Sequence, residues 1–440
     1  MRVAVVAPTA SPAIADVTFQ ALAHVRHRWD AQLWHPADQP DPIGCPVPVR
    51  TFRQADEATV RKLAAHDLVV WVLGDSPAHY PMFTMARRLP GLVVLHDAAM
   101  TGTVRGAATA AGELSELIDD VTAHHGPDAA QRLRSGDTGL ELQEWLQRCV
   151  DLDLNPQVLE GSLGVVVHSA WHARLVDGFT LGDVTLAPLP VPSSAADTAT
   201  ADDDGAVDAR LEALPDDAVL LVTVGNVNAN RCVDLLIDAV AADPWVRERT
   251  HVWAVGAIKD TMEDALRARA DELGVRFVAT GRVADRTLGT ILSRATFAAA
   301  LRDPVLEGQS ASVLTQMLAG IPVLVLNHAH YADLPDDAVV KVAPGPQARG
   351  QIATALHRLG RDDAARAAIG AAAARYAGSS RSGRQYADAL VEAGARALAA
   401  RPLVTATRDV ATALGRLTLN REPAVLAVTR DLLGELYGLI

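Results

Sequence analysis

Short runs of β-branched and aliphatic residues alternate along this chain with segments of helix length, and this alternation constrains the fold more than any other feature. Such runs span residues 3–7, 68–73, 92–95, 165–167, 184–187, 219–224, 251–255, 277–279, 297–301, 322–326 and 339–342. Strands separated by helix-length segments predict βαβ units. Continuously apolar strands are typical of the interior of a parallel sheet. The pattern therefore predicts an α/β protein.

The runs form two series, and 440 residues are enough for two or three domains. Residues 193–217 contain few large apolar side chains and predict a linker with a short helix. We expect a Rossmann-like domain over 1–192, a second over 218–385, and helices over 386–440 that partly pack back on the first domain. The last 40 residues are expected to form two amphipathic helices. Two such domains would face each other across a cleft, where the carboxyl ends of parallel strands bind ligands.

The composition narrows the classes of function. Hydrophobic residues make up 49% of the chain and aromatic residues only 4%, so the core is aliphatic. A net charge of -13 disfavours nonspecific nucleic-acid binding but leaves room for a local basic pocket. The three cysteines are far apart and odd in number, which fits a reducing compartment. The chain begins with a strand rather than a signal peptide, and it lacks an apolar run of about 18 residues. We therefore expect a cytoplasmic protein without a transmembrane segment.

The segment 301–337 contains the strongest candidate for a binding site. Residues 307–312 connect a predicted strand to a predicted helix over 313–319, and Gly320 follows that helix. Small residues at a helix start leave backbone N–H groups free beside the positive end of the helix dipole, which suits a diphosphate. An ordinary strand–loop–helix turn explains the segment equally well. The loop after residues 3–7 lacks G-x-G-x-x-G, which argues against a dehydrogenase-type dinucleotide site.

Two single residues stand at the predicted ends of strands. Arg231 follows the run 219–224 and begins a predicted helix, so we expect it to be exposed to the cleft, where it could hold a phosphate. A solvent-facing arginine at a helix start is the alternative. His96 follows the run 92–95 and could orient or deprotonate an acceptor, or contact a donor sugar. A hydrogen-bonded structural histidine is the alternative there.

Several segments resemble retaining group-1 glycosyltransferases of the GT-B superfamily, whose donor signature is E-G-x-G-x-x-x-x-E followed by A-x-x-x-G-x-P-V. Glu307-Gly308 resembles the first pair, and residues 319–323 resemble the end. A bacterial subgroup has L-R-x-P, A-E-L-P-D-D, G-H-V-N-P-N-K, L-G-N-S-P-x-H, V-L-H-D and G-I-A-D-Y-S. The stretches that resemble these six motifs, given in the order of the motifs above, are 301–304, 332–337, 225–231, 73–79, 94–97 and 14–16. The resemblance covers roughly residues 1 to 345.

The resemblance implies a GT-B fold and a glycosyltransferase that moves a sugar from a nucleoside-diphosphate sugar to an unknown acceptor, with retention and without cofactor or metal. The second domain would bind the donor and the first the acceptor. The implied catalytic residues are His96, which meets the donor sugar or acceptor, Arg231, which neutralises the leaving diphosphate, and Glu307, which binds sugar hydroxyls. The implied donor-binding residues are Asn226, Asn230, Arg282, Gly308, Gln309, Ser310, Ala311, Ser312 and Thr315. The implied acceptor-binding residues are Ala13, Asp16, His79 and Asp97.

The chain departs from the family pattern at the donor site. Thr315 stands where a ribose-binding Glu is usual, Asn226 where a cation is usual, and Ala13 where Gly is usual. In the subgroup's own frame, Glu and Gly are exchanged at positions 307 and 308. These departures keep open a noncatalytic GT-B homologue that acts as a nucleotide-sugar-binding or partner subunit. A nucleotide-sugar epimerase is disfavoured, because the Glu-Gly loop is followed by A-G-x-P-V.

Acidic and histidine-rich stretches provide no metal site in this interpretation. The run 202–204 lies in the expected linker and predicts a solvated charge run. His124-His125 precedes Gly126 and predicts a helix end. The sugar, the nucleotide, the acceptor and the oligomeric state are left open.

Overall fold

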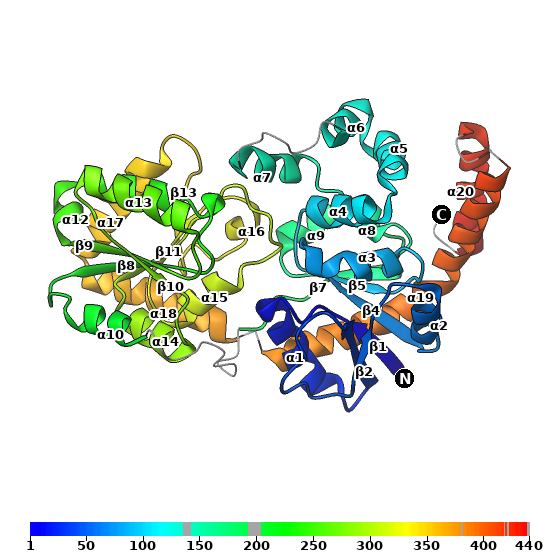
Figure 1. Cartoon of the computed structure of the whole chain (residues 1–440), viewed down its shortest axis with the longest axis horizontal. Coiled ribbons are helices and arrows are strands. Elements are labelled where there is room, and N and C mark those ends of the chain that lie inside the picture. Colours follow the sequence, from blue (N-terminus) through cyan, green and yellow to red (C-terminus); the bar gives the residue numbers. More distant parts are fainter. Residues whose placement is uncertain (135–141, 192–203, 380–381, 418, 420–421, 438–440) are drawn as a thin grey trace. The chain divides into compact units, whose positions relative to one another are not determined.

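A computed structural model describes residues 1–134, 142–191, 204–379, 382–417, 419 and 422–437 (Figure 1). The chain divides into two compact units. Unit 1 comprises Met1–Gly136, Asp151–Pro188 and Tyr386–Ile440, and unit 2 comprises Asp137–Val150 and Leu189–Gln385. Residues 193–203 of the expected linker, including Asp202 and Asp203, lie outside the described residues. The described part of the linker contains helix α10 (Asp204–Glu212).

Unit 1 contains a seven-stranded parallel sheet in the order β3-β2-β1-β4-β5-β6-β7. Its strands are β1 (Arg2–Val6), β2 (Asp30–Pro36), β3 (Val49–Phe52), β4 (Leu68–Leu73), β5 (Leu92–Leu95), β6 (Gly164–Val167) and β7 (Val184–Leu186). The apolar runs predicted five of these strands but missed β2 and β3. Polar residues interrupt β2, and β3 is an edge strand in which Phe52 alone is buried, so neither shows a continuous apolar run.

Helices cover both faces of the unit 1 sheet, and others pack on these helices or extend away from the sheet. The helices of unit 1 are α1 (Pro12–Val25), α2 (Glu57–Ala64), η1 (Pro77–His79), α3 (Tyr80–Ala86), α4 (Thr101–Ala111), α5 (Leu114–His125), α6 (Pro127–Arg134), α8 (Asn155–Leu159), α9 (Ala170–Val176), α19 (Gly383–Arg416) and α20 (Pro423–Tyr437). Alternate residues of β4, such as Trp71 and Leu73, share a core with Met82 of α3 and Val104 of α4. The other face is covered by α1 and α19 (Figure 1).

Unit 2 contains a six-stranded parallel sheet in the order β10-β9-β8-β11-β12-β13. Its strands are β8 (Val219–Val224), β9 (Thr250–Val255), β10 (Arg276–Gly281), β11 (Phe297–Ala300), β12 (Val323–Leu326) and β13 (Val340–Val342). This is the doubly wound order, in which the direction of winding reverses between β8 and β11. Phe297 of β11 pairs with Leu221 of β8 at this reversal. The loops that follow these two strands therefore lie where such sheets bind ligands.

Two helical layers enclose the unit 2 sheet (Figure 1). Besides α10, the helices are η2 (Ala229–Arg231), α11 (Val233–Ala241), α12 (Pro244–Arg249), α13 (Asp260–Leu273), α14 (Asp285–Arg294), α15 (Ala311–Leu318), α16 (Ala329–Ala332), α17 (Ala348–Gly360) and α18 (Asp363–Ser379). Helices α11, α13 and α17 form one layer, and α10, α14, α15 and α18 form the other. Helix α7 (Leu142–Asp151) groups with unit 2 except for its last residue.

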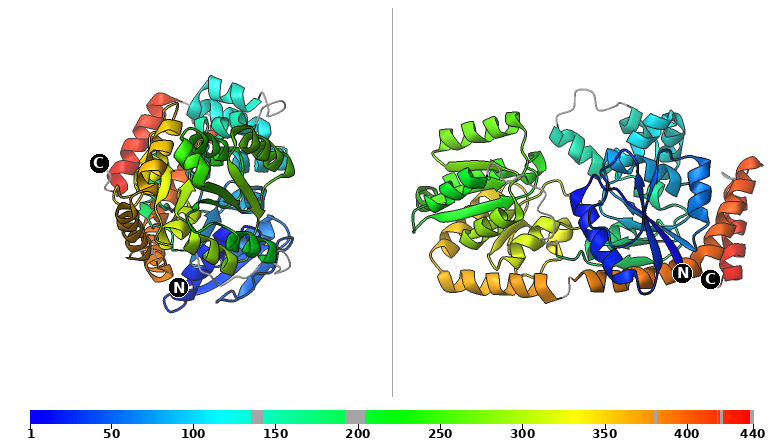
Figure 2. Two further views of the ribbon diagram at one scale, coloured as in Figure 1. Left: turned by 90° about the vertical axis from the view of Figure 1, so that its left-hand side faces the viewer. Right: turned by 60° about the horizontal axis from the view of Figure 1, so that its bottom comes forward.

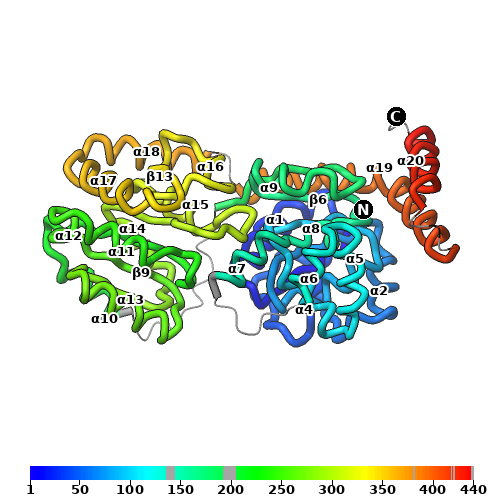
Figure 3. The backbone as a smooth tube through the Cα atoms, turned by 90° about the horizontal axis from the view of Figure 1, so that it is seen from above, coloured from blue at the N-terminus to red at the C-terminus, as the bar shows by residue number. Residues whose placement is uncertain are grey.

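Helix α19 is a single helix of 34 residues that runs along unit 1 (Figures 2 and 3). Arg396 donates a hydrogen bond to the Thr185 hydroxyl and forms an ion pair with Asp183. Arg401 donates a hydrogen bond to the carbonyl of Asp67. The expectation of two helices in the last 40 residues is wrong in one respect, because the first of them is the end of α19, which continues past Pro402. Among the described residues, no helix combines the length and apolar character needed to cross a bilayer.

Candidate functional site

Arg231 lies at the winding reversal of unit 2, between the loops that follow β8 and β11. It ends η2 and is only 5% exposed, so the expectation that it begins a helix and is exposed was wrong. The short turn η2 and Cys232, at φ 50°, separate it from α11 and turn its side chain inward. Its Nε donates to the carbonyl of Asn226 at 3.3 Å, and its Nη1 donates to Ser312 Oγ at 3.3 Å.

Gly225 makes room for this guanidinium. It adopts φ 111°, a conformation that favours glycine. A β-carbon at this position would lie 2.2 Å from Arg231 Nη2. The glycine that follows β8 thus lets the arginine fold back over the strand end.

The positive charge of Arg231 has no acidic partner within 4 Å among the residues that the structure describes. The nearby Arg302 is paired instead, with its Nε 3.2 Å from Glu307 Oε1. Burial, and then the charge of Arg302, lower the pKa of Arg231 to about 10. Arg231, Arg302 and Glu307 together carry one positive charge in excess. A buried cation without a carboxylate partner suits an anion as a ligand.

Glu307 is held by several neighbours at once. Besides Arg302, its Oε1 accepts a hydrogen bond from the Tyr331 hydroxyl at 3.3 Å and lies 3.8 Å from His330 Nε2. Burial alone would raise its pKa, but the charge of Arg302, followed by His330 and Arg231, holds the pKa of this carboxyl well below its usual range. Glu307 is therefore an ionised carboxylate, and its side chain is 18% exposed.

The loop 307–312 leads into α15 as expected, although this helix begins at Ala311, two residues before the predicted start. Ser310 is its N-cap, and the Ser310 Oγ accepts from Val313 N and lies 3.1 Å from Ser312 Oγ. The Gln309 side chain accepts from the backbone of Leu189. Thr315 donates to the carbonyl of Ala311 within the helix.

Asn230 joins the two loops. Its Nδ2 donates to the carbonyl of Pro304 at 3.0 Å, and its Oδ1 accepts from Arg302 Nη1 at 2.7 Å. Asn226 is exposed, and its carbonyl holds Arg231. Arg282 is exposed after β10, and within the described chain no hydrogen bond or ion pair links it to this cluster.

Arg302 and Tyr331 belong to the cluster, and sequence reasoning missed both as site residues. Arg302 stands in the second position after β11, inside a segment that already resembled the family. The reasoning that selected Arg231 and His96, namely that they follow predicted strands, would also have selected Arg302. Tyr331 comes from α16, and its contact with Glu307 spans 24 residues, which no local pattern predicts.

A second cluster lies at the carboxyl ends of the strands of unit 1. His96, which follows β5, is 8% exposed, and its Nδ1 lies 3.1 Å from His168 Nε2. His168 follows β6, is fully buried, and was not predicted. The signal was available, since His168 follows the run 165–167 just as His96 follows 92–95.

The expected acceptor residues converge in part. A β-carbon on Gly74 would lie 2.8 Å from Asp97 Oδ2, 3.1 Å from His79 Nε2 and 3.2 Å from Ile14. Asp97 and His79 therefore meet at the end of β4. Asp16 lies on α1 and accepts from Gln20, and Ala13 is exposed in the first turn of the same helix.

Asp75 anchors this cluster to α4. Its Oδ1 accepts from Thr103 N at 2.6 Å, and its own N–H donates to Asp97 Oδ2 at 2.7 Å. Burial raises the pKa of Asp75 to about 6, against the hydrogen bonds from Thr103 and Gly102.

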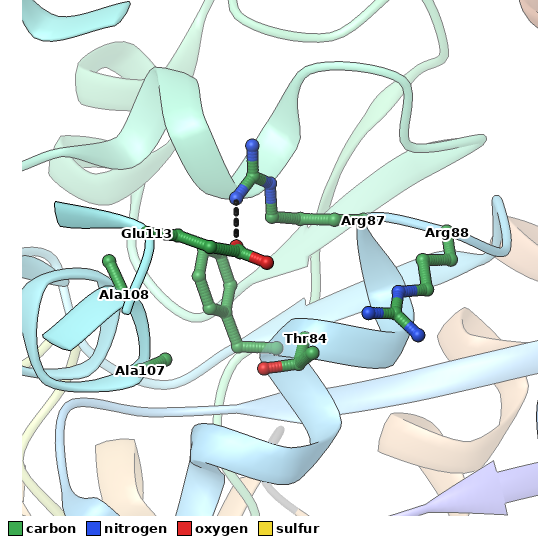
Figure 4. A pocket seen from close by; sticks show the side chains of 7 residues that line it. Thr84, Arg87, Arg88, Ala107, Ala108 and Glu113 are labelled. Atoms are coloured by element: carbon green, nitrogen blue, oxygen red, sulfur yellow. Dashed lines mark ion pairs between the residues drawn. The ribbon is translucent and has the colours of Figure 1, made fainter. Parts of the chain in front are cut away.

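Two further features of unit 1 lie apart from the strand ends. A cavity of about 240 Å³ between α3 and α4 is lined by Phe83, Arg88 and their neighbours, and Arg87 and Glu113 lie 3.9 Å apart there (Figure 4). The side chains of Asp120, His124 and Glu160 bring ligand atoms within 4.8 Å of one another. All three are at least partly exposed, and the expectation that the protein needs no metal stays a prediction.

The fold and the cluster define a class of protein: two Rossmann-like units, one with a buried cationic site at its winding reversal. Residues 218–362 match the family model described as Glycosyl transferases group 1. This segment contains every expected donor-site residue. Over this segment of the 440-residue chain, the match confirms the predicted resemblance to group-1 glycosyltransferases. No curated protein matches the sequence.

Solved structures confirm the GT-B fold. HepE from Anabaena, in complex with UDP and glucose, is 14% identical, with a TM-score of 0.58 over 89% of this chain and 98% of HepE. A glycosyltransferase from Rickettsia africae is 10% identical, with a TM-score of 0.61 over 90% of this chain and 98% of its own. WaaG, a glycosyltransferase involved in lipopolysaccharide biosynthesis, is 16% identical, with a TM-score of 0.54 over 90% of this chain and 99% of WaaG. At such identities the likeness shows the fold alone.

Proposed function

We propose that the protein transfers a sugar from a nucleoside-diphosphate sugar to an acceptor, with retention of the anomeric configuration and without a cofactor. The observation that carries the proposal is the buried charge of Arg231, which has no acidic partner within 4 Å in the described part of the chain. A diphosphate supplies the missing negative charge. Its negative charge grows as the sugar–phosphate bond breaks, so a fixed cation stabilises the transition state more than the ground state.

The loops around Arg231 supply the remaining contacts. In this proposal, the Arg231 guanidinium and the backbone N–H groups at the start of α15 bind the phosphates. Glu307, held in its ionised form by Arg302, accepts hydrogen bonds from sugar hydroxyls through its exposed part. The structures of HepE with UDP, and with UDP and glucose, support a uridine nucleotide as the first donor to test.

Unit 1 binds the acceptor in this proposal. Asp97 and His79 meet at the end of β4, and His96 lies at the end of the adjacent β5. A carboxylate and imidazoles suit hydroxyl groups, so the acceptor is expected to present one. The cytoplasmic location stays a prediction.

A noncatalytic nucleotide-sugar-binding protein is the second candidate. Thr315 favours this candidate, because it provides no carboxylate for the ribose. Its hydroxyl donates a hydrogen bond to the Ala311 carbonyl instead. The two candidates share the nucleotide site and differ in turnover.

The test combines binding with turnover. Thermal shifts are measured with UDP-, GDP- and dTDP-sugars and with the free diphosphates. Donor hydrolysis and transfer are then followed with the stabilising donor and hydroxyl acceptors, and NMR identifies the anomer formed. Stabilisation with turnover supports the enzyme, stabilisation without turnover the binding protein, and no shift at millimolar nucleotide contradicts both. A ligand at one hundred times its Kd stabilises by about 2.7 kcal/mol, which such a scan detects.

A further inference from the structure

Two histidines end neighbouring strands of unit 1 and are hydrogen-bonded to each other. Strands β5 and β6 pair in parallel, with Val94 opposite Val166, so His96 and His168 leave the sheet side by side. Their rings lie 4.6 Å apart between centroids. The contact joins His168 Nε2 to His96 Nδ1 at 3.1 Å.

The positions of the protons follow from the backbone. His168 Nδ1 lies 3.0 Å from the carbonyl oxygen of Ala187, which can only accept, so Nδ1 carries a proton. In a neutral His168 the other nitrogen, Nε2, is then an acceptor. His96 Nδ1 must therefore donate to it, and this leaves His96 Nε2 with its lone pair.

The surroundings keep both rings neutral. Burial lowers the pKa of His168 to about 4. Burial, and then the neighbouring His168, His79 and His172, lower the pKa of His96 well below its usual value. The groups facing the pair are His79 of η1, His172 of α9 and Tyr386 of α19, whose ring lies 5.9 Å from His168. Asp97, next in the chain, accepts from the backbone of Asp75.

The lone pair of His96 Nε2 accepts no hydrogen bond from the described part of the chain. This atom is buried and has no hydrogen-bond partner among the described residues. Buried polar atoms are normally paired, so an unpaired acceptor at the carboxyl end of a strand calls for an explanation, and a ligand contact is one. Near the end of β5 the natural ligand group is a hydroxyl, which donates where His96 accepts.

We infer that His168 is a positioning residue, which holds His96 as the Nδ1–H tautomer so that its Nε2 accepts a hydrogen bond from a hydroxyl of the bound substrate. This rests on the proposed function, because the hydroxyl belongs to the sugar or to its acceptor. His168 itself touches no substrate in this account. The Ala187 carbonyl fixes the proton of His168 on Nδ1, and His168 Nε2 in turn fixes the proton of His96 on Nδ1.

The first test does not depend on turnover. Protein labelled with ¹⁵N in histidine is examined by long-range ¹H–¹⁵N NMR, with His96→Gln used to assign the signals. The expected result is a His96 ring with the proton on Nδ1 and no titration between pH 6 and 8. A proton on Nε2, or titration in that range, overturns the inference even if the protein proves to be an active transferase.

The second test uses two variants of His168. In His168→Gln, the side-chain amide can donate to Ala187 and accept from His96, so we expect turnover within about threefold of wild type and the same tautomer. His168→Leu can do neither, so we expect kcat to fall at least about tenfold, and His96 to lose its single tautomer. Thermal melting controls for folding.

The outcomes of these variants separate the two proposals. Wild-type rate and an unchanged His96 signal in His168→Leu overturn the positioning role. If wild type turns over no donor, the proposed function fails, and the tautomers of His96 in wild type and both variants still decide the inference.

Discussion

Replacing Arg231 by methionine should leave the fold as stable as before, or more stable, while it weakens nucleotide binding. Methionine keeps an unbranched side chain in the same space but carries no charge. The side chain is 5% exposed, and burial with the charge of Arg302 lowers its pKa to about 10. The unfolded state therefore binds this proton more tightly than the folded state does. The charge costs stability at every pH below the folded pKa, neutral pH included.

The magnitude follows from that shift and from the hydrogen bonds. A fall of this size corresponds to roughly 3 kcal/mol at pH 7, as an order of magnitude. The hydrogen bonds of Arg231 to Asn226 and Ser312 stabilise the fold by about 1 kcal/mol each, and this offsets part of the cost of the buried charge. The free energy of unfolding should thus stay unchanged or rise by about 1 kcal/mol. In a domain of this size, that raises the Tm by about 2–4 °C.

Arg302→Met is the matched control, because Arg302 is the paired arginine of the same cluster. Its loss leaves the ionised Glu307 without its ion-pair partner, which should destabilise the fold by about 3–5 kcal/mol. Removing Arg231 should instead weaken UDP binding at least about tenfold, because a hydrogen bond to a charged group contributes roughly 1.5–3 kcal/mol. Thermal melts and calorimetry with UDP measure both. A strongly destabilised Arg231→Met that binds UDP like wild type would show that Arg231 is structural.

Three further substitutions probe the donor loops. Gly225→Ala places a β-carbon 2.2 Å from the Arg231 guanidinium at φ 111°, so UDP affinity should fall about tenfold or more by calorimetry; wild-type affinity would contradict the packing. The pKa of Glu307 is lower in the folded protein than its ordinary value of 4.5, which we take for the unfolded chain. The ionised carboxylate therefore stabilises the fold above pH 4.5, and this contribution is lost progressively as the pH falls below that value. Melts of Glu307→Gln should therefore lack part of the acid loss of Tm seen in wild type, and donor turnover should fall at least about tenfold. Thr315→Glu should tighten UDP binding if a ribose lies beside α15, and unchanged affinity would place the ribose elsewhere.

Long apolar runs predicted most of the fold. β4 and β8 are buried throughout and are apolar at almost every position, so their composition alone marks them as interior strands. β3 escaped because an edge strand needs apolar residues on fewer positions. The loop 307–312 was also predictable, since small residues at a helix start are a local signal.

The electrostatics of the site were not predictable from local patterns. Arg231 was expected to be exposed because it precedes a helix, whereas a 3-10 turn and a left-handed Cys232 bury it. The partners of the site residues lie far away in sequence: 81 residues separate Arg231 from Ser312, and 72 separate His96 from His168. Only the tertiary fold determines that Arg302 has a carboxylate partner and that Arg231 has none within 4 Å among the described residues.

A crystal structure with UDP tests the central claim most directly. We expect the β-phosphate to lie within hydrogen-bond distance of the Arg231 guanidinium and of the backbone N–H groups at the start of α15. The uridine should extend from the winding reversal between β8 and β11. A UDP molecule bound elsewhere in unit 2, with Arg231 still buried and unpaired, would contradict the account.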